Sequence, residues 1–127
     1  MAEIQRVQHA SVPMPIGGHD VARSFYTGVL GLPEVTPPST LGHLQLVWFR
    51  MACGQEIHCF GDDKPEPNHP AQHLCLEVDD LDSFLNQVRG HGVAVEETVS
   101  ITNRPRAMIR DPFANLIELT QITGEYD

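Results

Sequence analysis

Two histidines occupy the same setting, each at the head of a short apolar run. His9 lies in "QHASV" (residues 8–12) and His73 lies in "QHLCL" (residues 72–76). Imidazole is a ligand for Zn, Ni, Mn or Fe(II) when further imidazole or carboxylate groups lie nearby. A single strand histidine is more often a hydrogen-bonded or exposed residue, so the rest of the sequence must show whether these two are related.

The sequence repeats itself beyond the two Gln-His pairs. Residues 49–60 ("FRMACGQEIHCF") align with residues 109–120 ("IRDPFANLIELT") at an offset of 60, which places His58 over Glu118. The two strand-start histidines correspond at an offset of 64, so a short gap separates the two alignments. Two copies of one unit predict two similar modules, whereas solenoids need more copies.

The repeat singles out a candidate ligand set of His9, His58, His73 and Glu118. If a pseudo-two-fold axis relates the modules, these side chains converge near it. Two histidines and one carboxylate would leave open metal positions for substrate or water. Glu118 lies within the apolar segment 115–122. A buried carboxylate there needs a partner, and either a metal or an arginine meets that need.

His58 is the least determined member of this set. In the run "EIHCF", alternation points either Glu56 and His58 or Ile57 and Cys59 inward. If Glu56 and His58 face the site, Glu56 is a second candidate ligand or acid–base group. The catalytic candidates are then Glu118, His58 and Glu56.

Basic and aromatic side chains supply candidate contacts to a substrate. Arg106 and Arg110 share strand parity and suit an anionic group, although surface arginines that balance an acidic protein show the same pattern. Arg50 is the repeat counterpart of Arg110 and joins this group. The aromatic residues that could stack on a planar ligand are Trp48, Phe49, Phe60 and Phe113.

The elements expected to position these residues follow the same order in both halves. For the first half we expect a strand at 4–12, a helix capped by Asp20 and running to about Leu30, and strands at 32–35, 41–51 and 55–60. For the second half we expect a strand at 72–78, a helix capped by Asp80, and strands at 93–97, 104–110 and 115–122. Each half therefore predicts the order strand, helix, strand, strand, strand.

The length of 127 residues predicts one domain, 1–127, and the expected strands and helices assign it to the α+β class. The Pro- and Asp-rich stretch between the halves has no apolar periodicity, so we expect a linker at 63–69. The first βαβββ module would then cover residues 1–62 and the second module residues 70–127.

Composition excludes several classes of partner. The formal charge is −9, with only 8 Lys and Arg, so the chain lacks the basic surface expected of a nucleic-acid or anionic-membrane binder. The apolar runs are far too short for a membrane span, and the N-terminus lacks the pattern of a signal peptide. Three cysteines without a CxxC motif favour a reduced, cytoplasmic protein.

The chain resembles the vicinal oxygen chelate superfamily, which includes glyoxalase I, bleomycin resistance proteins, fosfomycin resistance enzymes and extradiol dioxygenases. The resemblance covers nearly the whole chain. It rests on "VQHASV…HDVARSFYTGVLGLPEV", "HLCLEVDDLDSFLNQVRGHGVAVEE" and "IRDPFANLIELTQ". It implies a glyoxalase-like fold, in which two βαβββ modules form a curled mixed sheet around a metal cleft, often in a homodimer.

By position, the resemblance implies that His9, His73 and Glu118 bind a divalent metal (Zn, Ni, Mn or Fe). Glyoxalase-like members have a Glu ligand where this chain has His58. The implied function is a metal-dependent lyase or isomerase that chelates vicinal oxygens of a small substrate. The alternatives are a metal-free bleomycin-resistance-type protein that sequesters an aromatic ligand, and a small ring-cleaving dioxygenase.

Overall fold

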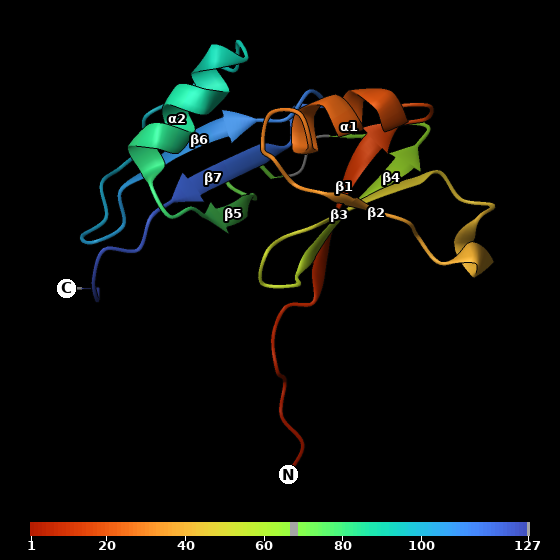
Figure 1. Ribbon diagram of the computed structural model, residues 1–127, viewed down its shortest axis with the longest axis horizontal. Coiled ribbons are helices and arrows are strands. Elements are labelled where there is room, and N and C mark those ends of the chain that lie inside the picture. Colours follow the sequence, from red (N-terminus) through yellow and green to blue (C-terminus); the bar gives the residue numbers. More distant parts are fainter. Residues whose placement is uncertain (67–68, 127) are drawn as a thin grey trace. The chain divides into compact units, whose positions relative to one another are not determined.

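The computed structural model describes residues 1–66 and 69–126. It consists of two compact units, Met1–Pro65 and Glu66–Asp127, and in each unit an α-helix accompanies a β-sheet (Figure 1). Both sheets contain parallel and antiparallel strand pairs, so the predicted α+β class is confirmed. No helix in the described part of the chain is long and apolar enough to cross a membrane.

The division between the units falls inside the predicted linker, 63–69. Residues 67 and 68 of that linker lie outside the described residues. Each unit is treated separately below, because each has its own sheet and its own buried apolar side chains.

The first unit contains a four-stranded sheet in the order β1-β4-β3-β2. Its elements are β1 (His9–Pro15), α1 (His19–Tyr26), β2 (Glu34–Val35), the short 3-10 helix η1 (Ser39–Leu41), β3 (Leu46–Arg50) and β4 (Glu56–Asp62). β1 runs parallel to β4, while β3 is antiparallel to both β4 and β2. Tyr26 of α1 stacks on Phe49 of β3 with ring centroids 5.1 Å apart, so this face of the sheet packs against the helix.

The first strand lies further along the chain than its apolar pattern predicts. The expected strand was 4–12, but β1 spans His9–Pro15 and pairs with β4 along its whole length. In the sequence, Pro13 and Pro15 are typical of a turn, so no strand was expected past residue 12. Because β1 is an edge strand of its sheet, prolines are tolerated there.

The first helix is shorter than predicted and has a different cap. Gly18 occupies the N-cap position, and Asp20 lies in the first turn, where it pairs with Arg23 at 3.0 Å. α1 ends at Tyr26, but the backbone continues to coil, since the Val29 amide donates to the Phe25 carbonyl at 2.9 Å. The prediction of helix to about residue 30 therefore overstated the regular helix by about one turn.

The second unit contains a three-stranded sheet in the order β5-β7-β6. Its elements are β5 (Leu74–Glu77), α2 (Leu81–Gly90), β6 (Arg106–Arg110) and β7 (Leu116–Thr120). Asp80 caps α2 as predicted, because its side chain accepts from the Ser83 amide at 3.1 Å. The strand expected at 93–97 is reduced to one antiparallel bridge between Glu96 and Met108.

The strand registers reproduce the repeat seen in the sequence. His58 of β4 lies beside Ser11 of β1 and Trp48 of β3. Glu118 of β7 lies in the same way beside Cys75 of β5 and Met108 of β6. The two units are therefore built on one plan, with β4 and β7 as equivalent central strands.

Residue type and strand register assign the two faces of each central strand, because the side chains of both faces are buried there. Ile57 and Ile117 are 1% and 0% exposed and, like Cys59 and Leu119, belong to the apolar face that packs on the helix of their unit. The opposite surface is called the far face here; its side chains are those of Trp48, Arg50, Glu56, His58 and Phe60 in the first unit, and Arg106, Met108, Arg110, Leu116 and Glu118 in the second. The structure therefore distinguishes the two orientations left open for "EIHCF". Glu56 and His58 lie on the far face, and Ile57 and Cys59 lie on the apolar face.

Candidate functional site

His58 lies within a stack of three rings on the far face of the first unit. The Trp48 ring is parallel to it, with centroids 3.7 Å apart and planes 2° apart. The His9 ring stacks on it at 4.1 Å and 18°. The side chain of His58 is 9% exposed, so these contacts fix the plane of a buried imidazole.

Glu56 connects His58 to Arg50. Its Oε1 lies 2.9 Å from His58 Nε2, and its Oε2 accepts from Arg50 Nε at 2.8 Å and from a terminal guanidinium nitrogen at 2.6 Å. The hydrogen bonds from His58 and Arg50 lower the pKa of Glu56, while burial lowers the pKa of His58. At neutral pH we therefore expect a carboxylate at Glu56 and a neutral imidazole at His58.

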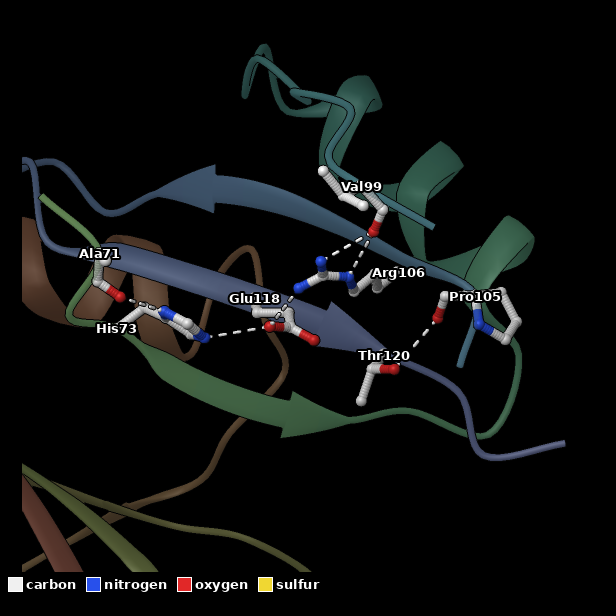
Figure 2. Close-up of polar contacts among 7 residues, drawn as sticks. All are labelled: Ala71, His73, Val99, Pro105, Arg106, Glu118 and Thr120. Atoms are coloured by element: carbon white, nitrogen blue, oxygen red, sulfur yellow. Dashed lines mark hydrogen bonds and ion pairs between the residues drawn. The ribbon is translucent and has the colours of Figure 1, made fainter. Parts of the chain in front are cut away.

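On the far face of the second unit, the carboxylate of Glu118 lies within hydrogen-bonding distance of His73 and of Arg106 (Figure 2). His73 Nε2 lies 3.0 Å from Glu118 Oε1, and a terminal nitrogen of Arg106 lies 3.2 Å from the same oxygen. The remaining Arg106 donors, Nε and a second terminal nitrogen, bind the Val99 carbonyl at 3.0 and 2.7 Å. Of the two partners considered for Glu118, the structure therefore shows an arginine.

The His73 ring is oriented by the backbone. Its Nδ1 lies 2.7 Å from the Ala71 carbonyl, which can only accept, so Nδ1 carries the proton. In the neutral ring the lone pair is then on Nε2 and faces a Glu118 oxygen, which is also an acceptor. Two acceptors 3.0 Å apart need a shared proton or a cation.

The separation of these two acceptors suits two adjacent ligands of one metal ion. Metal–N and metal–O bonds of about 2.0–2.2 Å, at angles between octahedral and tetrahedral, place the ligand atoms about 2.8–3.6 Å apart. His73 Nε2 and Glu118 Oε1 are 3.0 Å apart. A carbonyl bound to the other ring nitrogen is also the usual second contact of a metal-binding histidine. This pair therefore has the spacing of two adjacent metal ligands.

His9 shows the same division between its ring nitrogens. Its Nδ1 donates to Gln8 Oε1 at 2.6 Å, which leaves the lone pair on Nε2. In both Gln-His pairs, Nε2 is therefore the histidine nitrogen that carries the lone pair. They differ in the acceptor, since His73 uses the Ala71 backbone rather than Gln72.

The structure brings the predicted ligands together in pairs. His9 contacts His58 in the first unit, and His73 contacts Glu118 in the second. Among the described residues, no group of three or more His, Cys, Asp and Glu side chains is placed to hold a metal ion. Each unit thus carries a two-residue part of the predicted set.

The predicted substrate contacts have different surroundings. Arg50 and Arg106 each bind a buried glutamate, whereas Arg110 is exposed and donates to the Ala114 carbonyl at 3.1 Å. Phe60 and Trp48 lie on the far face of their sheet. Phe49 was expected among the ligand-stacking aromatics, but it is 0% exposed and lies in the core against α1.

Three contributors to the site were not among the predicted residues. The Ala71 and Val99 carbonyls are backbone groups, and residue type gives no signal for them. Cys75 is exposed beside Glu118 in the neighbouring strand. Partial burial of the thiol, with the charge of Glu118, raises the pKa of Cys75 to about 11.

Comparison with solved structures identifies proteins of the same fold. A glyoxalase family protein from Bacillus anthracis is 28% identical, with a TM-score of 0.90 over 96% of this chain and 98% of that one. TnmS3, an antibiotic-binding protein from Streptomyces sp. CB03234, is 24% identical, with a TM-score of 0.76 over 96% and 99% of the two chains. The lactoylglutathione lyase of Agrobacterium tumefaciens is 22% identical, with a TM-score of 0.72 over 94% and 96%.

The last two similarities show a shared fold only. No curated protein sequence matches the chain. The family model described as "Glyoxalase/Bleomycin resistance protein/Dioxygenase superfamily" matches residues 6–119, which is most of the chain. The chain therefore belongs to the glyoxalase/bleomycin resistance protein/dioxygenase superfamily.

Proposed function

We propose that this protein is a metal-dependent enzyme of the lyase or isomerase type that acts on a small substrate with adjacent oxygens. The proposed ligands of the divalent ion (Zn, Ni, Mn or Fe) are His9, His73 and Glu118, with His58 as a fourth ligand or a nearby base. A bound metal would supply Lewis-acid polarisation of a substrate oxygen.

The observation that carries this proposal is the arrangement around His73. The Ala71 carbonyl holds the Nδ1 proton, and the Nε2 lone pair points at a carboxylate at the separation expected of two adjacent ligands. A sequestering protein has no need for such a pair. The Arg106 contact is compatible with a metal, because a carboxylate oxygen has two lone pairs, so Glu118 Oε1 can accept from Arg106 and still bind a cation.

Proton transfer would fall to the neutral imidazole of His58. Burial lowers its pKa, so the ring is uncharged at neutral pH and has one nitrogen able to accept a substrate proton. Trp48 and His9 keep the ring in a fixed plane, which limits the directions from which a substrate can approach.

An anionic group on the substrate would bind Arg110. Of the three predicted arginines, Arg50 and Arg106 already neutralise Glu56 and Glu118. Arg110 binds only a backbone carbonyl among the described residues, so most of its guanidinium is free to pair with a carboxylate or phosphate.

Elemental analysis tests the metal requirement directly. Protein purified without a metal-affinity column should contain a divalent metal near one equivalent per chain. Metal-stripped protein should take the metal up again on titration. Protein that is isolated metal-free and binds none of the four candidate ions on titration would contradict the proposal.

A second function, binding of a planar ligand without metal, is favoured by one observation. The indole Nε1 of Trp48 is buried and has no hydrogen-bond partner among the described residues. A ligand acceptor would satisfy this donor while the neighbouring rings provide stacking surface. Trp48 is the single tryptophan, so its fluorescence reports such binding. Binding that is unchanged in a His73→Ala, Glu118→Ala double variant would favour this function over the enzyme.

The proposal includes a homodimer in the cytoplasm. Its support is the family resemblance and the three free cysteines, which suit a reducing compartment. Light scattering after size-exclusion chromatography should give twice the chain mass of 14.1 kDa. A mass of one chain across the working concentration range would contradict the dimer.

A further inference from the structure

The Glu56 carboxylate is already committed to groups of its own unit. Oε1 lies 2.9 Å from His58 Nε2, and Oε2 accepts from two nitrogens of Arg50 at 2.8 and 2.6 Å. The side chain is 7% exposed. A buried carboxylate bound to three donors is poorly placed to take a proton from a substrate, so its role must be sought in the groups it holds.

The bond to Glu56 determines which nitrogen of His58 carries the proton. An ionised carboxylate accepts hydrogen bonds and donates none, so Nε2 of His58 must be the N–H. The neutral ring then has its lone pair on Nδ1. This is the reverse of His9 and His73, in which Nδ1 is the protonated nitrogen.

The stacked rings fix the plane of the His58 ring but leave its orientation within two alternatives. The rings of His9 on β1 and Trp48 on β3 both stack on the His58 ring of β4 and fix its plane. A half-turn of the ring about its Cβ–Cγ bond keeps that plane but exchanges Nε2 with a carbon atom. Only one of the two orientations places a donor against Glu56, so the carboxylate selects both the orientation and the tautomer.

The second unit shows that the fold does not require this carboxylate. At the repeat offset of 60, Leu116 stands where Glu56 stands, and Met108 stands where Trp48 stands. The β6–β7 pair has the same register as the β3–β4 pair without a carboxylate at this position. The presence of Glu56 is therefore explained by the histidine at position 58 rather than by strand pairing.

We propose that Glu56 is a positioning residue that fixes His58 as the Nε2–H tautomer and so presents Nδ1 as its lone-pair donor. Arg50 keeps Glu56 ionised and oriented for this purpose. The use of Nδ1 as a metal ligand or base rests on the proposed function, whereas the tautomer itself does not.

Nitrogen NMR tests the tautomer on metal-free protein. With ¹⁵N-labelled histidine at pH 8, long-range ¹H–¹⁵N correlations distinguish protonated from unprotonated ring nitrogens. We expect Nε2–H for His58 in the unaltered protein. In Glu56→Gln and Glu56→Ala the ratio of Nε2–H to Nδ1–H should fall about tenfold or more, since a charge-assisted hydrogen bond is lost. Glu56→Asp should retain more of the preference than Glu56→Ala.

Glu34→Gln is the matched control. Glu34 also pairs with an arginine of the first unit, Arg23, but does not bond to a histidine, so its variant should leave the His58 signals unchanged. Glu56→Gln keeps the side-chain shape and provides a folded variant if Glu56→Ala unfolds. An unchanged Nε2–H preference in folded Glu56→Gln, or Nδ1–H in the unaltered protein, would overturn the proposal.

The outcome is separable from that of the proposed function. A tautomer shift in the variants, together with no metal binding by the unaltered protein, supports the positioning role and contradicts the metal enzyme. Metal binding by the unaltered protein, together with an unchanged tautomer in the variants, supports the metal enzyme and contradicts the positioning role.

Discussion

The two units share one backbone plan but differ on their far faces. In the first unit the central strand carries Glu56 and His58, and a tryptophan stacks on the histidine. In the second unit Leu116 and Glu118 take the equivalent places, and the carboxylate binds His73 and Arg106. The helix-side faces, by contrast, are apolar in both units. The repeat has therefore kept its packing residues and varied the residues that carry chemistry.

This difference also explains the two arginines at equivalent positions. Arg50 lies opposite Glu56 in the sheet, and Arg110 lies opposite Leu116. One guanidinium is therefore neutralised by a buried carboxylate, while the other remains available on the surface. At equivalent positions of the duplicated fold, Arg50 thus holds a buried glutamate, whereas Arg110 is a candidate substrate contact.

The largest expected effects on stability concern the helix-side face, which is apolar in both units. Ile57→Ala and Ile117→Ala remove equivalent side chains that are 1% and 0% exposed. Each should lower the free energy of unfolding by about 2–5 kcal/mol, because the lost burial leaves a cavity. Urea denaturation measures both. A cost below about 1 kcal/mol for either variant would contradict the view that the helix-side faces are equivalent.

Exchanging residues between the far faces should have unequal effects. Glu56→Leu installs the residue of the second unit and deprives His58 and Arg50 of their acceptor, at a cost of about 1–3 kcal/mol. Leu116→Glu makes the reverse exchange next to Arg110, so a new ion pair offsets lost burial and the change should stay within about 1 kcal/mol. Equal losses of stability in the two denaturation curves would argue against the asymmetry.

Acid should destabilise metal-free protein partly through the first unit. The pKa of His58 lies below 6.5 and that of Glu56 below 4.5 in the folded state, so the unfolded chain binds more protons at both residues. Their stabilising contributions are present above these values and are lost as the pH falls, first for His58 and then for Glu56. Thermal melts from pH 8 to pH 4 should show a shallower decline in His58→Gln.

His43→Gln serves as the comparison for this series. His43 is an exposed histidine in the loop before β3. Its variant should follow the curve of the unaltered protein at every pH. A decline in His58→Gln as steep as that of the unaltered protein would show that the His58 imidazole does not contribute in this way.

The smallest expected effect concerns the thiol beside Glu118. Partial burial and the Glu118 charge raise the pKa of Cys75 to about 11, so the thiolate is scarce at pH 8. In a metal-free Cys53→Ser background, iodoacetamide should alkylate Cys75 slowly and faster as the pH rises. Glu118→Gln removes the negative charge beside the thiol and should increase the rate a few-fold. An unchanged alkylation rate would contradict a contribution of Glu118 to the raised pKa of Cys75.

The sequence predicted the repeat and the alternation of side chains along the central strands better than it predicted element ends. Alternation and the offset between halves identified His58 and Glu118 as equivalent, and the strand registers confirm this. The end of β1 was misjudged because Pro13 and Pro15 indicate a turn in isolation, although an edge strand accepts them. Edge position depends on pairing with a strand more than 40 residues away, which local pattern does not report.

The contacts that orient the site were beyond sequence reasoning for a different reason. His73 and Arg106 depend on the carbonyls of Ala71 and Val99, and a carbonyl is present at every residue. Only the loop conformation decides which carbonyl points at the ring or the guanidinium. The choice between metal and arginine as the partner of Glu118 was likewise left open by residue type, since Arg106 reaches it across neighbouring strands.

Calorimetric titration of metal-stripped protein with Zn²⁺, Ni²⁺, Mn²⁺ and Fe²⁺ tests the central claim most directly. The account predicts about one site per chain for at least one of these ions. It also predicts affinity losses of about tenfold or more in His73→Ala and in Glu118→Gln, with no loss in the matched variant Glu34→Gln. Absence of binding by the unaltered protein, or equal affinity in all variants, would contradict the claim that His73 and Glu118 form part of a metal site.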